Sequence, residues 1–346
     1  MSHASSEDSE PTAIVVFDAV ALELDRDLPE PAIRDGYMLR SAGRVAERTL
    51  TLPGPAAELR GTPRITATVA VQPRLVHPAP GLSLGGAQET RVARPGDPWT
   101  RMGNVTVLLP SEGDEPIEIE LMRFITGFGG AGTFTQDLTA LSPLLQGKVT
   151  LRVMMTTYMN PGWDVSLTLT YSDEAGYRRP AFVAPLFNEQ HVCAKNNVLR
   201  ARVVIPEGLE QPRIRLMSTG HATDGAGGDE FITRTHILRI DGEEVLRWRP
   251  WAENGASLRS LNPMSGRFNI DGRIVWSSDL DRSGWHPGLV VTPMQVPLPE
   301  LSPGAHHIEL EVVGIRPADP EDELGDHGYW RISGVVVADE VWPVAE

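Results

Sequence analysis

The chain has 346 residues, a formal net charge of −15 at pH 7, 41% hydrophobic residues and 22% charged residues. This composition is typical of a globular protein, and the length allows two domains that each bury a hydrophobic core. The negative charge argues against nucleic acid and anionic membranes as partners, because Lys and Arg lead the binding to phosphate-rich surfaces.

The first residues, MSHASSEDSEPT, are polar and acidic, and we expect a disordered tail over residues 1–12. They lack the basic and apolar regions of a secretory signal, and no uncharged apolar run of about 18 residues is long enough to span a membrane. Cys193 is the single cysteine, which excludes an intrachain disulfide. We therefore expect a cytoplasmic protein. No feature of the sequence sets its oligomeric state.

Short apolar segments recur along the chain between turn-forming Pro and Gly residues, and they predict strands. In the segment WDVSLTLTY, Val165, Leu167 and Leu169 alternate with Ser and Thr, which is typical of a half-buried strand. Similar segments lie at residues 13–24, 63–72, 103–110, 148–158, 197–206, 235–242, 306–315 and 329–339. Residues 138–147 allow at most one or two helical turns, because Pro143 interrupts them. The predicted fold class is all-β.

A polar stretch with Gly and Pro, SDEAGYRRP at residues 172–180, separates two strand-rich halves. Such stretches are typical of domain boundaries. We predict an N-terminal domain over residues 13–175 and a C-terminal domain over residues 176–346.

The segment GHATDGAGGDEFITRTHILRIDG, residues 220–242, combines glycines with histidines and acids. A dinucleotide-binding loop needs G-x-G-x-x-G between a strand and a helix. Here Glu230 interrupts the pattern after Gly225 and Gly227, and a predicted strand follows. The glycines therefore indicate a turn, in which they permit positive φ angles.

Six segments of the chain, in order, resemble motifs of the peptide:N-glycosidase F family, bacterial amidases that release N-linked glycans from asparagine. They are residues 97–107, 122–153, 220–238, 261–268, 281–291 and 328–339. The resemblance implies two eight-stranded antiparallel jelly-roll domains side by side, with the functional cleft between them. The same tandem architecture resembles that of the peptidylglycine and dopamine copper monooxygenases.

The resemblance also implies a set of cleft residues, and this chain departs from it at the acids. Thr100 stands where the family has its key catalytic aspartate, and Thr156 stands at a second acid, whereas Glu230 retains the third. Matching residues are found at Arg101, Arg282, His221 and Trp285. The family's disulfide positions hold His286, Gly228 and Ile232. We therefore expect a diverged protein rather than a standard N-glycan amidase.

Glu230, Arg101 and Arg282 are the candidate catalytic residues. Nearby guanidinium groups are expected to lower the pKa of Glu230, so that it accepts hydrogen bonds rather than donating a proton. The arginines would bind carboxylate or hydroxyl groups. The candidate substrate-binding residues are Trp285, His221, Thr100, Thr156, Tyr158 and Trp99, whose rings are suited to stacking on a sugar or amide. The alternative is that Glu230 is a buried structural partner of an arginine.

A further hypothesis, besides a hydrolase, is a metal-dependent oxygenase. His221, Asp224, Glu230 and His286 include ligand types that hold copper, iron or zinc. No H-x-H or H-E-x-x-H pair sets a preformed geometry, and the resemblance explains His221 without a metal. Three hypotheses stay open: a hydrolase acting on an amide- or sugar-bearing small molecule or peptide, a ligand-binding protein without catalysis, and a metal-dependent oxygenase.

Overall fold

The computed structural model describes residues 10–54, 63–76, 93–173, 178–222, 228–270, 272–298, 301–317 and 328–341. Their regular structure is almost entirely β-strand, which confirms the predicted fold class. The helical segments of this part of the chain are short 3₁₀ helices: η1 (Thr139–Leu144), η2 (Gly255–Leu261) and η3 (Ser277–Asp279). No helix among the described residues is long and apolar enough to cross a membrane.

Two of the predicted segment boundaries lie wholly or partly outside the described residues. Residues 1–9 of the expected tail lie outside the described residues, and the first strand already begins at Thr12. The expected domain boundary at residues 175 and 176 also lies outside them. The two-domain division therefore stays a prediction.

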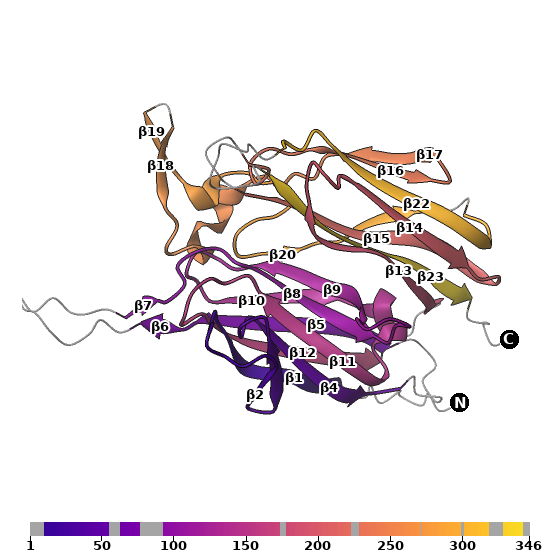
Figure 1. Cartoon of the computed structure of the whole chain (residues 1–346), viewed down its shortest axis with the longest axis horizontal. Helices are drawn as coiled ribbons and strands as arrows, with labels where there is room; N and C mark the ends of the chain where they lie inside the picture. The colour runs from indigo at the N-terminus through magenta and orange to yellow at the C-terminus, as the bar shows by residue number, and fades with distance from the viewer. Residues whose placement is uncertain are drawn as a thin grey trace, which may run out of the picture.

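Strands from the first half form a sandwich of two antiparallel sheets (Figure 1). One sheet contains, in spatial order, β1 (Thr12–Leu22), β12 (Trp163–Asp173), β5 (Pro63–Pro73) and β10 (Gly132–Asp137). The other contains β2 (Ala32–Arg34), β3 (Tyr37–Arg40), β4 (Val45–Leu52), β11 (Gly147–Met155), β8 (Met102–Leu109), β9 (Ile117–Ile125) and β20 (Val290–Val291). Eight long strands thus carry the sandwich, and three short ones extend one sheet.

The core of this sandwich follows the period-two pattern of the sequence. Val165, Leu167 and Leu169 of β12 are completely buried, and the Ser and Thr between them are partly exposed. These side chains pack against Val105 and Leu151 of the facing sheet in one continuous cluster. Burial of one face by each sheet is what fixes the register of such strands.

Strands from the second half form another four-on-four sandwich. Its first sheet contains β13 (Arg178–Val192), β23 (Tyr329–Val341), β15 (Leu209–His221) and β21 (Met294–Pro297). Its second contains β14 (Val198–Ile205), β22 (Gly304–Val313), β16 (Thr235–Ile240) and β17 (Glu243–Trp248). Two small hairpins complete the strands: β6 (Leu75–Val76) with β7 (Arg94–Pro95), and β18 (Arg267–Ile270) with β19 (Arg273–Trp276).

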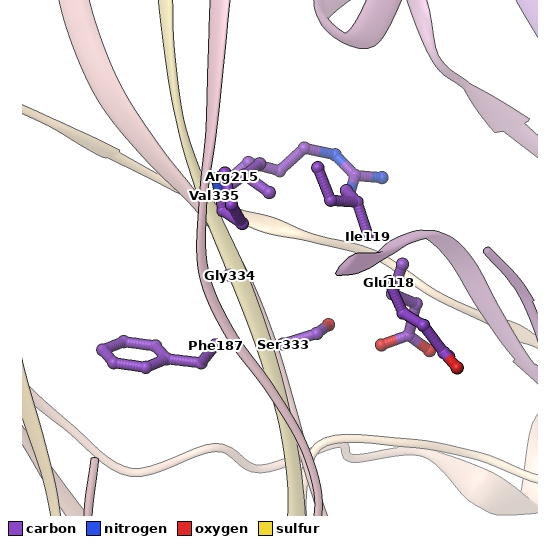
Figure 2. A pocket seen from close by; sticks show the side chains of 9 residues that line it. Glu118, Ile119, Phe187, Arg215, Ser333, Gly334 and Val335 are labelled. Atoms are coloured by element: carbon purple, nitrogen blue, oxygen red, sulfur yellow. The ribbon is translucent and has the colours of Figure 1, made fainter. Parts of the chain in front are cut away.

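The two sandwiches lie side by side (Figure 1). They are joined by strand pairing and by buried arginines. β20 of the second half pairs with β9 of the first, so one sheet contains residues from both halves. Arg215, 4% exposed, donates from Nη2 to the Leu121 carbonyl oxygen at 2.6 Å. Figure 2 shows this side chain extending from the second sandwich toward Ile119 of β9. The cavity beside it measures about 10 Å³, which is at the lower limit for one water molecule.

A glycine-rich turn of the first sandwich, in the segment GFGGAG, contacts the last residue of η2 and the residue that follows it. A Cβ at Gly127 would lie 2.0 Å from the Leu261 carbonyl oxygen, and a Cβ at Gly130 would lie 2.5 Å from it. The side chain of Asn262 accepts a hydrogen bond from the Phe128 backbone N–H at 3.0 Å. Because only glycine permits this approach, the two segments meet closely.

Candidate functional site

Two adjoining pockets lie between the sandwiches, and we call them together the cleft. The larger has a volume of about 660 Å³ and is lined by residues of both halves, including Trp99, Phe231 and Phe268. The smaller has a volume of about 160 Å³ and is lined by residues such as Tyr158 and His221. Both are lined by Thr100, Arg101 and Glu230. The larger pocket alone falls within the range of volumes typical of small-molecule sites.

Glu230 lies in the turn that follows β15, and its backbone is fixed from both sides. Its N–H donates to the Ala222 carbonyl at 3.3 Å, and its carbonyl accepts from the Ser283 N–H at 2.9 Å. Its carboxylate Oε1 accepts a hydrogen bond from Arg282 Nε at 2.8 Å. The side chain is 14% exposed, so one face of the carboxylate remains open to the cleft.

The pKa of Glu230 is raised, which corrects the expectation that nearby arginines lower it. Burial has the largest effect and disfavours the charged form, whereas the charge and the hydrogen bond of Arg282 act in the opposite direction and are outweighed. Glu230 is therefore able to hold a proton at a pH where an exposed glutamate has lost it. A carboxyl group in this state serves as a proton donor as well as an acceptor.

Arg282 lies beneath Glu230 rather than at the cleft surface. Its side chain is completely buried, and it lines neither pocket. Nη1 donates to the Leu280 carbonyl at 2.9 Å and Nη2 to Ser277 Oγ at 3.1 Å. Its guanidinium carbon lies 5.0 Å from the ring centroid of Trp285. With its donors directed inward, Arg282 positions Glu230 instead of contacting a ligand.

Arg101 does line both pockets, and its partner is an acid that the sequence reasoning missed. Asp97 is fully buried and accepts from Arg101 Nε at 2.7 Å. It also accepts from Thr157 Oγ1 at 2.6 Å and from Trp163 Nε1 at 3.3 Å. The only sequence signal for this role was the spacing of Asp97 and Arg101, four residues apart in the segment DPWTR. Arg101 is thus held in place with its charge compensated.

The two threonines bring hydroxyl groups and no charge to the smaller pocket. Thr156 Oγ1 donates to the Met102 carbonyl at 3.0 Å and accepts from the Met102 N–H at 3.1 Å, which extends the pairing of β11 with β8. Thr100 lines both pockets. Glu230 is consequently the one carboxylate among the described residues that line the cleft.

Aromatic side chains lie at the rim and at the wall. Trp99 and Tyr158 are 58% and 65% exposed. The Arg101 guanidinium carbon lies 5.2 Å from the centroid of the Tyr158 ring. Trp285, in contrast, is 5% exposed and donates from Nε1 to the Gly220 carbonyl at 2.8 Å. The rim rings are therefore available for stacking, whereas Trp285 forms part of the wall.

His221 is a neutral member of a row of stacked rings. Its ring centroid is 5.7 Å from that of Trp285 and 5.3 Å from that of Tyr329. Nε2 forms a hydrogen bond of 2.8 Å with Thr219 Oγ1. Burial, followed by the positive charges of Arg331 and Arg123, lowers the pKa of His221 well below its usual value. His221 therefore contributes shape and a hydrogen-bonding nitrogen, and no charge.

The metal hypothesis is not supported by the described residues. No group of three or more His, Cys, Asp or Glu side chains in this part of the chain is arranged to hold a metal ion. His286 lines a different pocket, and its Nε2 forms a hydrogen bond of 2.7 Å with the Glu253 carbonyl. His221, Glu230 and His286 thus do not form a ligand set, and Asp224 lies outside the described residues.

Two family models match the chain in successive parts. The model for Peptide-N-glycosidase F, N terminal, matches residues 110–171. The model for Peptide-N-glycosidase F, C terminal, matches residues 189–337. Comparison with curated protein sequences gives no match.

The fold is also found in solved structures of low sequence identity. PNGF-II is 21% identical in one crystal form with a TM-score of 0.74, and the match covers 95% of this chain and 65% of that one. In a second crystal form the identity is 20%, the TM-score 0.75 and the coverage 97% and 66%. This chain therefore spans about two thirds of PNGF-II. PNGase F, a glycosylasparaginase from Flavobacterium meningosepticum, is 19% identical with a TM-score of 0.67, and the coverage is 97% and 98%.

Proposed function

Because this chain belongs to the peptide-N-glycosidase F-like family, we propose that it hydrolyses an amide bond of a polar, sugar- or amide-bearing small molecule or peptide in its cleft. The observation that carries this proposal is Glu230, a carboxyl group of raised pKa that faces the cleft and is held by a buried arginine. Perturbed carboxyl groups in clefts are typical of catalytic sites.

Glu230 is suited to both proton transfers of amide hydrolysis. As a carboxylate it accepts a proton from water while the water oxygen bonds to the amide carbon. As a carboxylic acid it then donates that proton to the leaving nitrogen as the C–N bond breaks. Arg101 donates hydrogen bonds to polar groups of the substrate, and Trp99 and Tyr158 provide rings on which a sugar can stack.

The proposed substrate is not an N-glycan on a glycoprotein. Thr100 and Thr156 leave one carboxylate among the described cleft residues where the resemblance implies three, so these residues offer no second ionised acid to a reaction that needs one. Native protein should therefore release no N-glycan from a denatured glycoprotein. Robust release would show that Glu230 alone is sufficient for that reaction.

The test is a panel of small glycosyl amides and N-acetylated dipeptides, incubated with native protein and with Glu230→Gln and analysed by mass spectrometry. We expect hydrolysis of at least one compound by native protein and a loss of 100-fold or more in the variant, because a positioned proton-transfer group contributes about 10²–10⁴-fold. Equal hydrolysis by both proteins would refute the role of Glu230.

A second candidate function is ligand binding without catalysis, which the two neutral threonines favour. The same panel separates the two functions. A compound that binds, with a measurable heat of binding, and is recovered intact from native protein supports binding alone. A cytoplasmic location is part of the proposal. With a single cysteine the chain forms no intrachain disulfide, so it does not need an oxidising compartment to fold.

A further inference from the structure

Beneath the smaller pocket, positive charge exceeds negative charge among the buried side chains. Arg123, Arg215 and Arg331 are 2%, 4% and 6% exposed, and Glu120 is 3% exposed. Glu120 is bound by Arg123, whose Nε donates to Oε1 at 2.9 Å and whose Nη2 donates to Oε2 at 2.5 Å. One carboxylate therefore faces three guanidinium groups at the junction of the sandwiches.

Two of these arginines have clear structural partners. Besides Glu120, Arg123 donates from Nη1 to Thr219 Oγ1 at 2.9 Å and to the Arg331 carbonyl at 2.8 Å. Arg215 donates from Nη2 to the Leu121 carbonyl at 2.6 Å. Both side chains connect one sandwich to the other, so the packing of the two halves accounts for them.

Arg331 is different, because two of its three side-chain nitrogens have no such partner. Its Nε and Nη2 are buried without a hydrogen-bond acceptor among the described residues, and no described carboxylate forms an ion pair with it. Burial, and then repulsion from Arg123, lowers the pKa of Arg331 to about 10. A buried, uncompensated cation is costly, and an orphaned buried polar group calls for a specific cause.

Arg331 lines the smaller pocket, and the other charges of that pocket are compensated. Arg101 is paired with Asp97, and Glu230 is paired with Arg282. His221 is neutral at ordinary pH because its pKa lies well below the usual value. The remaining polar groups nearby are hydroxyls, at Thr100, Thr156, Tyr158 and Tyr329. Among the described residues that line this pocket, the one uncompensated charge is therefore positive.

We propose that the smaller pocket binds an anionic group of the ligand, a carboxylate, sulfate or phosphate, and that Arg331 is the residue that holds it. Guanidinium groups bind oxyanions through directed, charge-assisted hydrogen bonds. The neutral body of the ligand lies in the larger pocket beside Trp99. This inference rests on the proposed function for the place where the ligand binds, and it narrows the substrate to anionic molecules.

The first test is calorimetric binding of four monosaccharides: N-acetylglucosamine, its 6-sulfate, glucuronate and glucose 6-phosphate. Native protein should bind at least one anionic sugar about tenfold or more tightly than the neutral one. Arg331→Gln should abolish this preference. Arg202→Gln, an exposed arginine on β14 that lines neither pocket, should retain it. The comparison of sulfate with glucuronate identifies the preferred oxyanion, and glucose 6-phosphate tests the phosphate ester.

The second test separates a ligand-binding arginine from a structural one by thermal unfolding without ligand. Arg331→Met removes a charge that the folded protein does not compensate, so the melting temperature should rise. The same anionic sugar should then raise the melting temperature of native protein and leave that of Arg331→Met unchanged. A structural arginine would give the opposite result, with a lower melting temperature in the variant.

Failure of this inference is distinct from failure of the proposed function. Equal affinity for neutral and anionic sugars, or no binding of any of them, would overturn the anion site, even if the amide panel shows hydrolysis that depends on Glu230. Conversely, anion binding that depends on Arg331 would support the site even if no amide is hydrolysed, and the protein would then be a binder of anionic ligands.

Discussion

Arg282 donates a hydrogen bond from Nε to Oε1 of Glu230 at 2.8 Å from a side chain that is completely buried, while the glutamate remains 14% exposed. The arginine thus supports the carboxylate from below and does not compete with a ligand for it. Burial outweighs this support and raises the pKa of Glu230. The Arg282–Glu230 ion pair therefore affects both the stability of the folded protein and the protonation of Glu230.

Replacing Arg282 with Met should destabilise the protein by about 3 kcal/mol, because removing one partner of a buried ion pair leaves the other uncompensated. Urea unfolding measures this loss. Arg247→Met is the control, since Arg247 pairs with Glu244 on the surface and such pairs contribute little. A loss no larger than that of the control would show that Arg282 does not support Glu230.

The pKa of the Glu230 carboxyl group should lie above the ordinary glutamate value. Burial raises it and Arg282 lowers it, so Arg282→Met should raise the pKa further. Carbon-13 NMR titration of the side-chain carboxyl measures both values, with Glu230→Gln to assign the signal. A pKa below the ordinary value would restore the expectation from sequence, that of a permanently ionised carboxylate.

Buried His236 should make the protein unstable in mild acid. Its Nδ1 donates to the Arg234 carbonyl and its Nε2 accepts from Ser218, and burial lowers its pKa to about 4. The unfolded chain binds the proton first, at about pH 6.5. Stability is therefore fully present above that pH and is lost as the pH falls toward 4, by about 3 kcal/mol.

The measurement is urea unfolding of native protein and His236→Gln at pH 7.5 and at pH 5. The variant should lose less stability between these pH values, whatever its stability at pH 7.5. His306→Gln is a control of opposite sign, since the hydrogen bond that His306 Nδ1 donates to the Asp241 carboxylate raises the pKa of His306. Its stabilising contribution is present below about pH 6.5 and is lost as the pH rises through the raised pKa. Identical pH dependence of native protein and His236→Gln would contradict the prediction.

Gly127→Ala should weaken both the junction of the sandwiches and the cleft. The added Cβ would lie 2.0 Å from the Leu261 carbonyl oxygen, so the loop must move. We expect a loss of about 1–3 kcal/mol in thermal unfolding, as for overpacking in a core. Ligand affinity should fall too, because neighbouring Phe128 lines the larger pocket. Gly266→Ala meets no atom within 4 Å and should be silent, so equal effects of the two variants would count against this contact.

The fold was predictable from the sequence because it depends on local patterns. Alternation of apolar and polar residues in β12 defines which side chains are buried, whatever the neighbouring strands are. The family motifs named Thr100, Arg101, Glu230, His221 and Trp285, and these five residues line one pocket; their role in function stays a prediction. The short strands β2, β3 and β20, which extend one sheet, had no comparable signal, because they are too short for a period to appear.

The ion-pair partners and the pKa values of the charged residues were decided by the tertiary structure alone. From sequence, Arg101 and Arg282 were equivalent partners for Glu230, yet Arg101 is bound by Asp97 and only Arg282 reaches the glutamate. The direction of the Glu230 pKa shift and the uncompensated charge of Arg331 likewise depend on burial. The free energy of a charge is set by its desolvation and by the distance to every other charge, and these quantities exist only once distant segments have packed together.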